Sequence, residues 1–234
     1  MTSRSGRRRI PEATVERLPV YLRLLDEQFD VGVTRISSEE IAELAAVNAA
    51  KVRKDLSYLG SYGTRGVGYE VEFLLCQIKR ELGLMQEWPV VIVGAGNLGQ
   101  ALAGYGGFMQ RGFLVGGIVD VDSEKVGTDV GGVTVSHVDE LAGLVAANDI
   151  SIGVVATPGS AAQAAADALV AAGVSSILNF APHGITAPHG ITVREVDLSV
   201  ELQILSYHEQ RRANARRAAT LRAVPGAGRG GQVS

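Results

Sequence analysis

The stretch that decides the fold of the second half of this chain is Val90-Val91-Ile92-Val93-Gly94-Ala95-Gly96-Asn97-Leu98-Gly99. A short apolar run, typical of a buried strand, leads directly into the pattern G-x-G-x-x-G, and a helical pattern follows. Gly94 permits a tight turn, Gly96 lets a pyrophosphate approach the backbone, and Gly99 lets the helix pack closely against the sheet. The N-terminus of that helix supplies unpaired N–H groups and a favourable dipole for phosphate. The stretch therefore predicts a dinucleotide-binding site.

Similar apolar runs recur downstream and alternate with helical patterns. The runs cover 113–119, 152–156 and 176–180, and the helical patterns lie near 97–110, 138–147 and 160–172. Alternating strands and helices are typical of βαβ units, and continuously apolar strands are typical of a parallel sheet buried on both faces. We therefore predict a Rossmann-like parallel sheet domain over residues 89–197.

An acidic residue stands where such a domain holds the adenosine ribose. Asp120 ends the second apolar run, 21 positions after Gly99. A carboxylate there can accept hydrogen bonds from the ribose hydroxyls and repel a 2′-phosphate, which favours NAD(H) over NADP(H). A glycine-rich turn that binds nothing, or that binds coenzyme A, is the alternative. The residues predicted to contact the cofactor are Gly94, Ala95, Gly96, Asn97, Leu98, Gly99, Asp120, Asp122, Lys125, Thr157, Pro158 and Asn179.

The segment 11–88 has a mainly helical pattern instead. Ser37 and Glu40 form a capping box for one helix, while Asn48 can cap the next helix and Gly60 ends it. Two helices joined by a short turn are typical of a helix-turn-helix, whose second helix enters the major groove of DNA. We predict a winged helix-turn-helix DNA-binding domain over 11–88, and hence a two-domain α/β chain.

The predicted recognition helix over 49–59 has an apolar inner face and a largely basic outer face. The residues expected on the outer face, and thus at the DNA, are Lys51, Arg53, Lys54, Ser57 and Tyr58. Glycines in the following segment, 62–69, favour a tight hairpin, which would form a wing. Tyr62 and Arg65 are expected to contact DNA there, with Arg65 at the tip reaching a minor groove or a phosphate. A solvated helix face is the alternative interpretation of these charges.

Charge is distributed unevenly along the chain. Residues 89–207 carry three basic and eleven acidic side chains, so this part is a poor surface for nucleic acid. A disordered basic arm is predicted at 1–10 and a disordered tail at 222–234. Just before the tail, 198–221 forms a predicted helix with an apolar edge that needs a covering surface, such as a partner subunit.

No apolar run approaches the ~18 residues of a membrane-spanning helix, and no apolar signal segment follows the basic N-terminus. The single cysteine, Cys76, cannot form a disulfide within the chain and fits a reducing compartment. Cys76 lies in an apolar helical stretch, and we expect it in the core. We therefore expect a cytoplasmic protein without membrane contact.

The sequence VRKDLSY at 52–58, followed by GSYGTRGVGY at 60–69, resembles the winged helix of the Rex family of bacterial redox-sensing repressors. The glycine fingerprint at 94–99 and the segment 193–202 resemble later parts of the same family, so the resemblance spans about 11–207. It implies a homodimer that binds an inverted-repeat operator. It also implies release from DNA by NADH, with NAD+ inactive or competing with NADH, and a C-terminal dimerisation helix swapped between subunits.

The resemblance also implies a switch made of Arg17, Tyr105 and Asp197. Tyr105 would lie on the first Rossmann helix near the nicotinamide, and Asp197 would exchange partners between Tyr105 and Arg17. NAD+ carries a positive nicotinamide ring and NADH a neutral one, and a buried charge network can sense that difference. The residues alone favour plainer roles: Tyr105 in the core, Asp197 as a helix cap and Arg17 at the surface.

Two other functions remain as alternatives: an NAD-dependent dehydrogenase with a DNA-binding appendage, and a coenzyme A-binding or ligase-like module on the same scaffold. Neither catalytic residues nor a metal site are predicted. A dehydrogenase needs an acid or base beside the nicotinamide, and His183 and His189 are the available candidates. Little chain remains after 197 for a substrate site, so an enzyme is not expected. The two histidines lie in a tandem repeat, APHGIT at 181–186 and again at 187–192, which favours a loop with two turns over a metal site.

Overall fold

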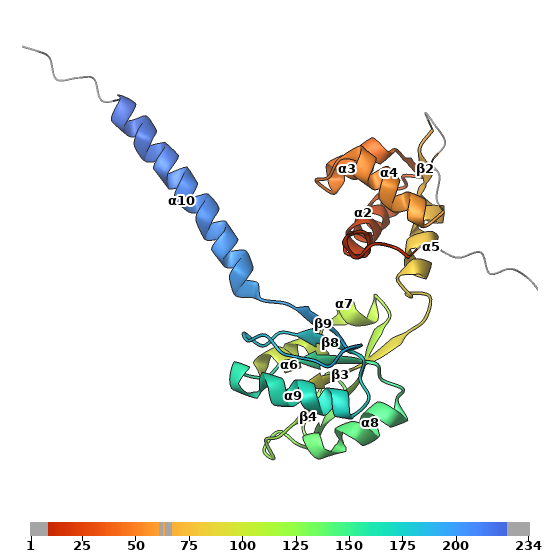
Figure 1. Cartoon of the computed structure of the whole chain (residues 1–234), viewed down its shortest axis with the longest axis vertical. Coiled ribbons are helices and arrows are strands. Elements are labelled where there is room, and N and C mark those ends of the chain that lie inside the picture. The colour runs from red at the N-terminus through yellow and green to blue at the C-terminus, as the bar shows by residue number, and fades with distance from the viewer. Residues whose placement is uncertain (1–8, 61–62, 64–66, 224–234) are drawn as a thin grey trace, which may run out of the picture. The chain divides into compact units, whose positions relative to one another are not determined.

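The computed structural model describes residues 9–60, 63 and 67–223, and the side chains of these residues as far as 217 (Figure 1). Tyr62, Arg65, most of the predicted basic arm at 1–10 and the tail from 224 onward lie outside the described residues. The chain divides into two compact units, Met1–Glu87 with Phe108–Gly112, and Trp88–Gly107 with Phe113–Ser234. Each unit is described by itself below.

Helices dominate the first unit. Its elements are α1 (Glu12–Val15), α2 (Leu18–Asp30), β1 (Arg35–Ile36), α3 (Ser38–Leu44), α4 (Ala49–Tyr58), β2 (Tyr69–Glu70) and α5 (Val71–Glu81). The two short strands pair antiparallel. Apolar residues at helical spacing from α2, α3, α4 and α5 form one core, and its largest fully buried members are Leu18, Tyr21, Leu25, Ile41, Leu56, Leu74 and Ile78.

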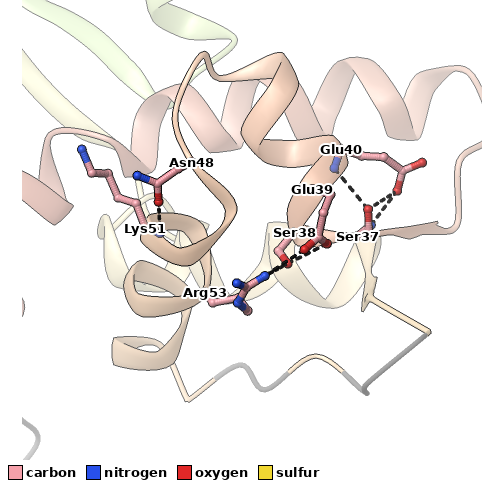
Figure 2. Close-up of polar contacts among 7 residues, drawn as sticks. All are labelled: Ser37, Ser38, Glu39, Glu40, Asn48, Lys51 and Arg53. Carbon is pink, nitrogen blue, oxygen red and sulfur yellow. Dashed lines mark hydrogen bonds and ion pairs between the residues drawn. The ribbon is translucent and has the colours of Figure 1, made fainter.

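The local signals of the helix-turn-helix are confirmed. Ser37 Oγ accepts a hydrogen bond from the Glu40 N–H at 3.1 Å, and Glu40 Oε2 accepts one from the Ser37 N–H at 2.7 Å (Figure 2). Asn48 Oδ1 accepts from the Lys51 N–H at 2.8 Å at the start of α4. Gly60, with φ +73°, follows the end of α4. The tip of the predicted wing lies outside the described residues, and β2 pairs with β1.

The first helix differs from the sequence expectation in one respect. The apolar residues from Val15 to Leu25 repeat at helical spacing, as a single helix would have them, but the chain turns at Arg17 and forms α1 and α2 separately. Pro19 explains the break, since it has no N–H to donate to the Val15 carbonyl and its ring would crowd that carbonyl. Arg17 therefore lies in the turn between the two helices, at the N-terminal cap of α2.

The second unit contains a seven-stranded sheet in the order β5-β6-β4-β3-β7-β8-β9 (Figure 1). All neighbouring strands are parallel except β5 and β6. The strands are β3 (Trp88–Val93), β4 (Phe113–Asp120), β5 (Asp129–Val130), β6 (Val133–His137), β7 (Ile152–Val155), β8 (Ser176–Asn179) and β9 (Thr192–Glu195). The predicted Rossmann-like parallel sheet is thus confirmed.

Helices cover both faces of this sheet. The covering helices are α6 (Asn97–Ala103), α8 (Leu141–Ala147) and α9 (Gly159–Ala171), with the 3-10 turn η1 (Val138–Glu140) before α8. The chain also contains α7 (Gly106–Met109) and the long helix α10 (Leu198–Ala223), whose described side chains are all exposed. Buried residues of α8 and α9 pack on one face with Val91, Val93 and Val155, while α6 adds partly buried residues to the other face around Ile92 and Ile118. The outer strands β5, β6 and β9 were not predicted, because polar residues interrupt their apolar pattern.

Two residue placements are corrected by the fold. Tyr105 does not lie on the first Rossmann helix, because α6 ends at Ala103 with Gly104 as its C-terminal cap, and α7 begins at Gly106. The Tyr105 side chain is 53% exposed, so it is not a core residue either. Cys76 is exposed rather than buried, since the buried face of α5 consists of Val71, Leu74, Leu75 and Ile78. None of the described helices is long and apolar enough to cross a membrane.

Candidate functional site

The three fingerprint glycines have three different surroundings. Gly94 has φ +105°, and a Cβ added there would lie 2.7 Å from the Ala156 carbonyl oxygen. Around Gly96 no atom lies within 4 Å of such a Cβ, whereas a Cβ on Gly99 would lie 1.8 Å from the Gly94 carbonyl oxygen. Gly94 thus makes the turn, Gly96 leaves space for an approaching group, and Gly99 allows α6 to pack on the loop.

Asp120 lies beside this glycine loop, at the end of β4, and is only 8% exposed. Its carboxylate accepts hydrogen bonds from the Ala95 N–H at 2.7 Å and the Asp122 N–H at 2.9 Å, and Lys125 Nζ lies at 3.2 Å. Burial alone would raise the pKa of Asp120, but these three donors outweigh it and hold the pKa below its ordinary value. An ionised carboxylate is therefore fixed next to the loop.

A buried hydroxyl without a partner lies across from the fingerprint. Thr157 Oγ1 has no hydrogen-bond partner among the described residues, although it is buried. Its methyl carbon would lie 3.1 Å from a Cβ added to Gly94, so Thr157 lines the same loop. Pro158 follows as the N-cap of α9. Since buried polar groups are normally hydrogen-bonded, this hydroxyl is suited to bond a polar group of a ligand in the glycine loop.

Asn179 is buried at the end of β8 and shapes the loop that follows. Its Oδ1 accepts from the Ala181 N–H at 3.0 Å, and its Nδ2 donates to the His183 carbonyl at 2.9 Å. The His183 ring in turn packs on the backbone of Gly159, where a Cβ would lie 2.0 Å from Nδ1. The first APHGIT copy is thus tied to the start of α9. Within the described part of the chain, no group of three or more His, Cys, Asp or Glu side chains could hold a metal ion.

The outward face of α4 carries the residues predicted to contact DNA. Lys51, Arg53, Lys54 and Ser57 are exposed, and Tyr58 is half-buried. Val52, Asp55 and Leu56 are buried on the opposite face. A basic face opposite an apolar face is what a helix needs to lie in a major groove while it packs on its own domain.

Sequence reasoning missed a cluster around Asp55, a charged residue on the inner face of α4. The carboxylate is 1% exposed and accepts from Arg17 Nε at 2.7 Å and Nη2 at 2.8 Å. Thr14 Oγ1 and Tyr21 Oη each donate to it at 2.9 Å. Burial raises the pKa of Tyr21 to about 12, with a further contribution from Asp55. Burial also opposes ionisation of Asp55, but hydrogen bonds from Arg17, Tyr21 and Thr14 keep its pKa below the ordinary value.

The three residues of the expected switch have these local partners. Arg17 is not a plain surface residue, because it pairs with the buried Asp55. Asp197 caps α10, where its Oδ1 accepts from the Ser199 N–H at 2.8 Å and the Ser199 hydroxyl at 2.7 Å. These hydrogen bonds lower the pKa of Asp197. The Tyr105 ring lies over Gly107, where a Cβ would lie 2.4 Å from the ring.

The C-terminal helix α10 has an uncovered apolar edge. Leu198, Leu202 and Leu205 form this edge and are exposed in the single chain, and Val200 and Ile204 are further exposed apolar residues on another side of the helix. The next turns of the helix are basic and include Arg211 and Arg212. Large exposed apolar patches are typical of interaction surfaces.

Two family models match parts of the chain. The model described as "Putative DNA-binding protein N-terminus" matches residues 9–57, and the model described as "CoA binding domain" matches residues 85–183. The first coincides with α1 to α4, and the second with the central strands and the glycine loop.

Curated relatives and solved structures match nearly the whole chain. The redox-sensing transcriptional repressor Rex of Streptomyces avermitilis is 60% identical over 94% of this chain and 87% of its own length. That of Carboxydothermus hydrogenoformans is 46% identical over 87% of this chain and 98% of its own. The crystal structure of RSP, a Rex-family repressor, has a TM-score of 0.82 and 36% identity, and the match covers 90% of this chain and 99% of RSP.

Two further structures of RSP contain ligands. One is in complex with β-NAD+ and operator DNA, with a TM-score of 0.82 and 36% identity over 91% of this chain and 98% of RSP. The other is in complex with β-NADH, with a TM-score of 0.81 over 89% and 98% of the two chains. Identity of this level over nearly full length shows that the chain belongs to the Rex family of redox-sensing transcriptional repressors.

Proposed function

We propose that this protein is a transcriptional repressor that binds an inverted-repeat operator and leaves it when NADH occupies the glycine loop. The observation that carries the proposal is the combination, in one chain, of a helix-turn-helix with a basic outer face and a fingerprint loop beside a buried, ionised Asp120. The structures of RSP with NADH, and with NAD+ and operator DNA, support operator DNA and a nicotinamide dinucleotide as the ligands of this chain. Such a repressor works where the chromosome lies, in the bacterial cytoplasm.

The cofactor would bind across the C-terminal ends of β3, β4 and β7. The start of α6, with Asn97 and Leu98, would direct backbone N–H groups at the pyrophosphate, which Gly96 leaves room to approach. Asp120 would accept from the ribose hydroxyls, with Asp122 and Lys125 beside it. Its charge disfavours nucleotides with a phosphate on that ribose, which include both NADP(H) and coenzyme A. The match to the CoA-binding family model therefore indicates a shared fold and not coenzyme A as the ligand.

On the DNA side, Lys51 and Lys54 would meet phosphates, and Ser57 and Tyr58 would lie nearer the base edges. Tyr62 and Arg65, outside the described residues, remain predicted wing contacts. An inverted-repeat operator requires two copies of α4 related by two-fold symmetry. We propose that the exposed edge of α10, with Leu202 and Leu205, is covered in that homodimer.

The proposed switch uses the charge of the nicotinamide. Asp197 would respond to this charge through Tyr105 and would compete for Arg17. Arg17 pairs with Asp55, and Asp55 lies on the recognition helix. A carboxylate that draws Arg17 away from Asp55 would therefore disturb α4 directly, which gives the family's switch a physical route to the DNA-reading element.

The test is a gel-shift titration of the full-length chain with a duplex selected from a random pool of palindromic sequences. We expect NADH to release the duplex and NAD+ at the same concentration to leave it bound. NADPH is the matched control, since the Asp120 carboxylate should exclude its 2′-phosphate. A selected duplex that stays bound at saturating NADH, or the absence of any preferred duplex, would contradict the proposed function.

A further inference from the structure

Arg53 on α4 is held by two residues of the first turn of α3. Its Nη1 donates to Glu39 Oε1 at 2.9 Å and to Ser38 Oγ at 3.0 Å. The Ser38 hydroxyl in turn donates to Glu39 Oε2 at 3.0 Å, so the three side chains form a closed ring of hydrogen bonds (Figure 2). Ser38 is buried, and it therefore fixes one side of the ring to the body of the unit.

Only one nitrogen of the Arg53 guanidinium takes part in this ring. The Nε–H and Nη2–H groups have no hydrogen bond to any other residue in the described ranges, and the side chain is 54% exposed. Because the guanidinium is planar, holding Nη1 also fixes the direction of the other donors. Arg53 therefore presents a pre-oriented pair of parallel donors on the edge of α4. A fork of this kind matches either the O6 and N7 of guanine or two oxygens of a phosphate.

The charge beside Arg53 decides between these two partners. Glu39 lies in contact with the guanidinium and is 68% exposed, and its hydrogen bond from Ser38 lowers its pKa. An ionised carboxylate repels an approaching phosphate, which carries a full negative charge, much more strongly than the neutral acceptor edge of a guanine. Lys51 and Lys54 on the same helix have no carboxylate partner among the described residues, and a flexible ammonium suits phosphate as a point charge.

We infer that Arg53 reads a guanine in each operator half-site, and that Glu39 and Ser38 are positioning residues that orient its guanidinium. This inference rests on the proposed function, because it assumes that α4 enters the major groove.

The experiment uses the full-length protein and a panel of duplexes derived from the selected operator. Each duplex carries one base-pair replacement made symmetrically in both half-sites, and affinities are measured by fluorescence anisotropy at several salt concentrations. Arg53→Ala should erase the preference for one G·C pair, a loss of about 5- to 150-fold in discrimination per half-site, and leave other positions unchanged. Glu39→Ala should weaken the preference at that same pair.

Glu40→Gln is the matched control. It removes one negative charge from the same helical turn, but Glu40 bonds Ser37 rather than Arg53, and glutamine can replace it in the capping box. This variant should keep the guanine preference. A uniform loss of affinity in Arg53→Ala across the panel, with a lower salt dependence, would identify a phosphate contact and overturn the inference. An unchanged guanine preference in Glu39→Ala would overturn the positioning role. A wild-type chain that prefers no duplex would overturn the proposed function itself.

Discussion

Replacing Asp55 by asparagine perturbs the cluster that joins α4 to α1 and α2. The carboxylate accepts four hydrogen bonds, two of them from Arg17, and has almost no contact with solvent. Breaking a buried ion pair by removing one charge costs about 3–5 kcal/mol, because the other charge is left uncompensated. Asparagine keeps one acceptor oxygen, and Arg17 is partly exposed, so we expect the lower end, about 3 kcal/mol.

Hydrogen exchange of the full-length protein, followed by mass spectrometry, measures the loss of stability in α2 and α4 separately from the rest of the chain. A loss of about 3 kcal/mol in the opening free energy speeds exchange of α2 and α4 amides by about 150-fold. Amides of β3 and β4, in the other unit, serve as the internal reference. Asp26→Asn is the matched control, since Asp26 forms an exposed ion pair with Lys79 at 3.3 Å, worth about 0–1 kcal/mol.

Asp55→Asn should also change how the stability of the first unit depends on pH. The pKa of Asp55 is lowered in the folded protein, so its stabilising contribution is present above the pKa of an unfolded aspartate, about 3.9. That contribution is lost as the pH falls below this value toward the folded pKa, and Asp55→Asn should lack this part of the acid sensitivity. Exchange of α4 amides in Asp55→Asn within twofold of that in Asp26→Asn would refute the reasoning.

Three further predictions follow from the same geometry. Gly99→Ala should weaken NADH binding at least about 10-fold, because the added Cβ would collide with the Gly94 carbonyl. Gly143→Ala is the control, since its Cβ would lie in open space on α8, and it should leave NADH binding unchanged. Nucleotide fluorescence measures the NADH affinity of both variants. Asp120→Asn should also lower NADH affinity by about 10-fold or more, and it should reduce the preference for NADH over NADPH. A variant that prefers NADH over NADPH as strongly as the wild type would disprove that Asp120 binds the adenosine ribose. Tyr21→Phe should destabilise the first unit by about 1 kcal/mol at neutral pH. Because the pKa of Tyr21 is raised to about 12, its stabilisation is present below the ordinary value near 10 and is lost as the pH rises toward 12. The difference in unfolding free energy between wild type and Tyr21→Phe should therefore become smaller between pH 10 and pH 12. A difference that stays constant over this interval would contradict the hydrogen bond from Tyr21 to Asp55.

Features encoded by neighbouring residues could be predicted from the sequence. The capping box of Ser37 and Glu40 and the Asn48 cap each depend on contacts within three residues. The glycine fingerprint is partly local, since Gly94 makes the turn with a positive φ and the carbonyl of Gly94 is what approaches Gly99. The outward face of α4 followed from the positions of Val52, Leu56 and Leu59.

Features that depend on distant residues could not be predicted. Asp55 resembles any surface charge in a basic helix, and its role requires Thr14, Arg17 and Tyr21 to meet it across about forty positions of sequence. The exposure of Cys76 depends on which face of α5 meets the core. The glycines around Tyr105 were visible in the sequence, but the helical pattern expected near 97–110 extended across the break that they cause.

The coupling between the two ligands is the centre of this account, and thermodynamic linkage makes it measurable. If NADH weakens operator binding by a given factor, the operator must weaken NADH binding by the same factor. NADH affinity, measured by nucleotide fluorescence, is compared for the free protein and for the protein saturated with its selected duplex. The account predicts a loss of at least about 5-fold in NADH affinity on the operator, and a smaller change for NAD+. An NADH affinity that is the same with and without operator would contradict it.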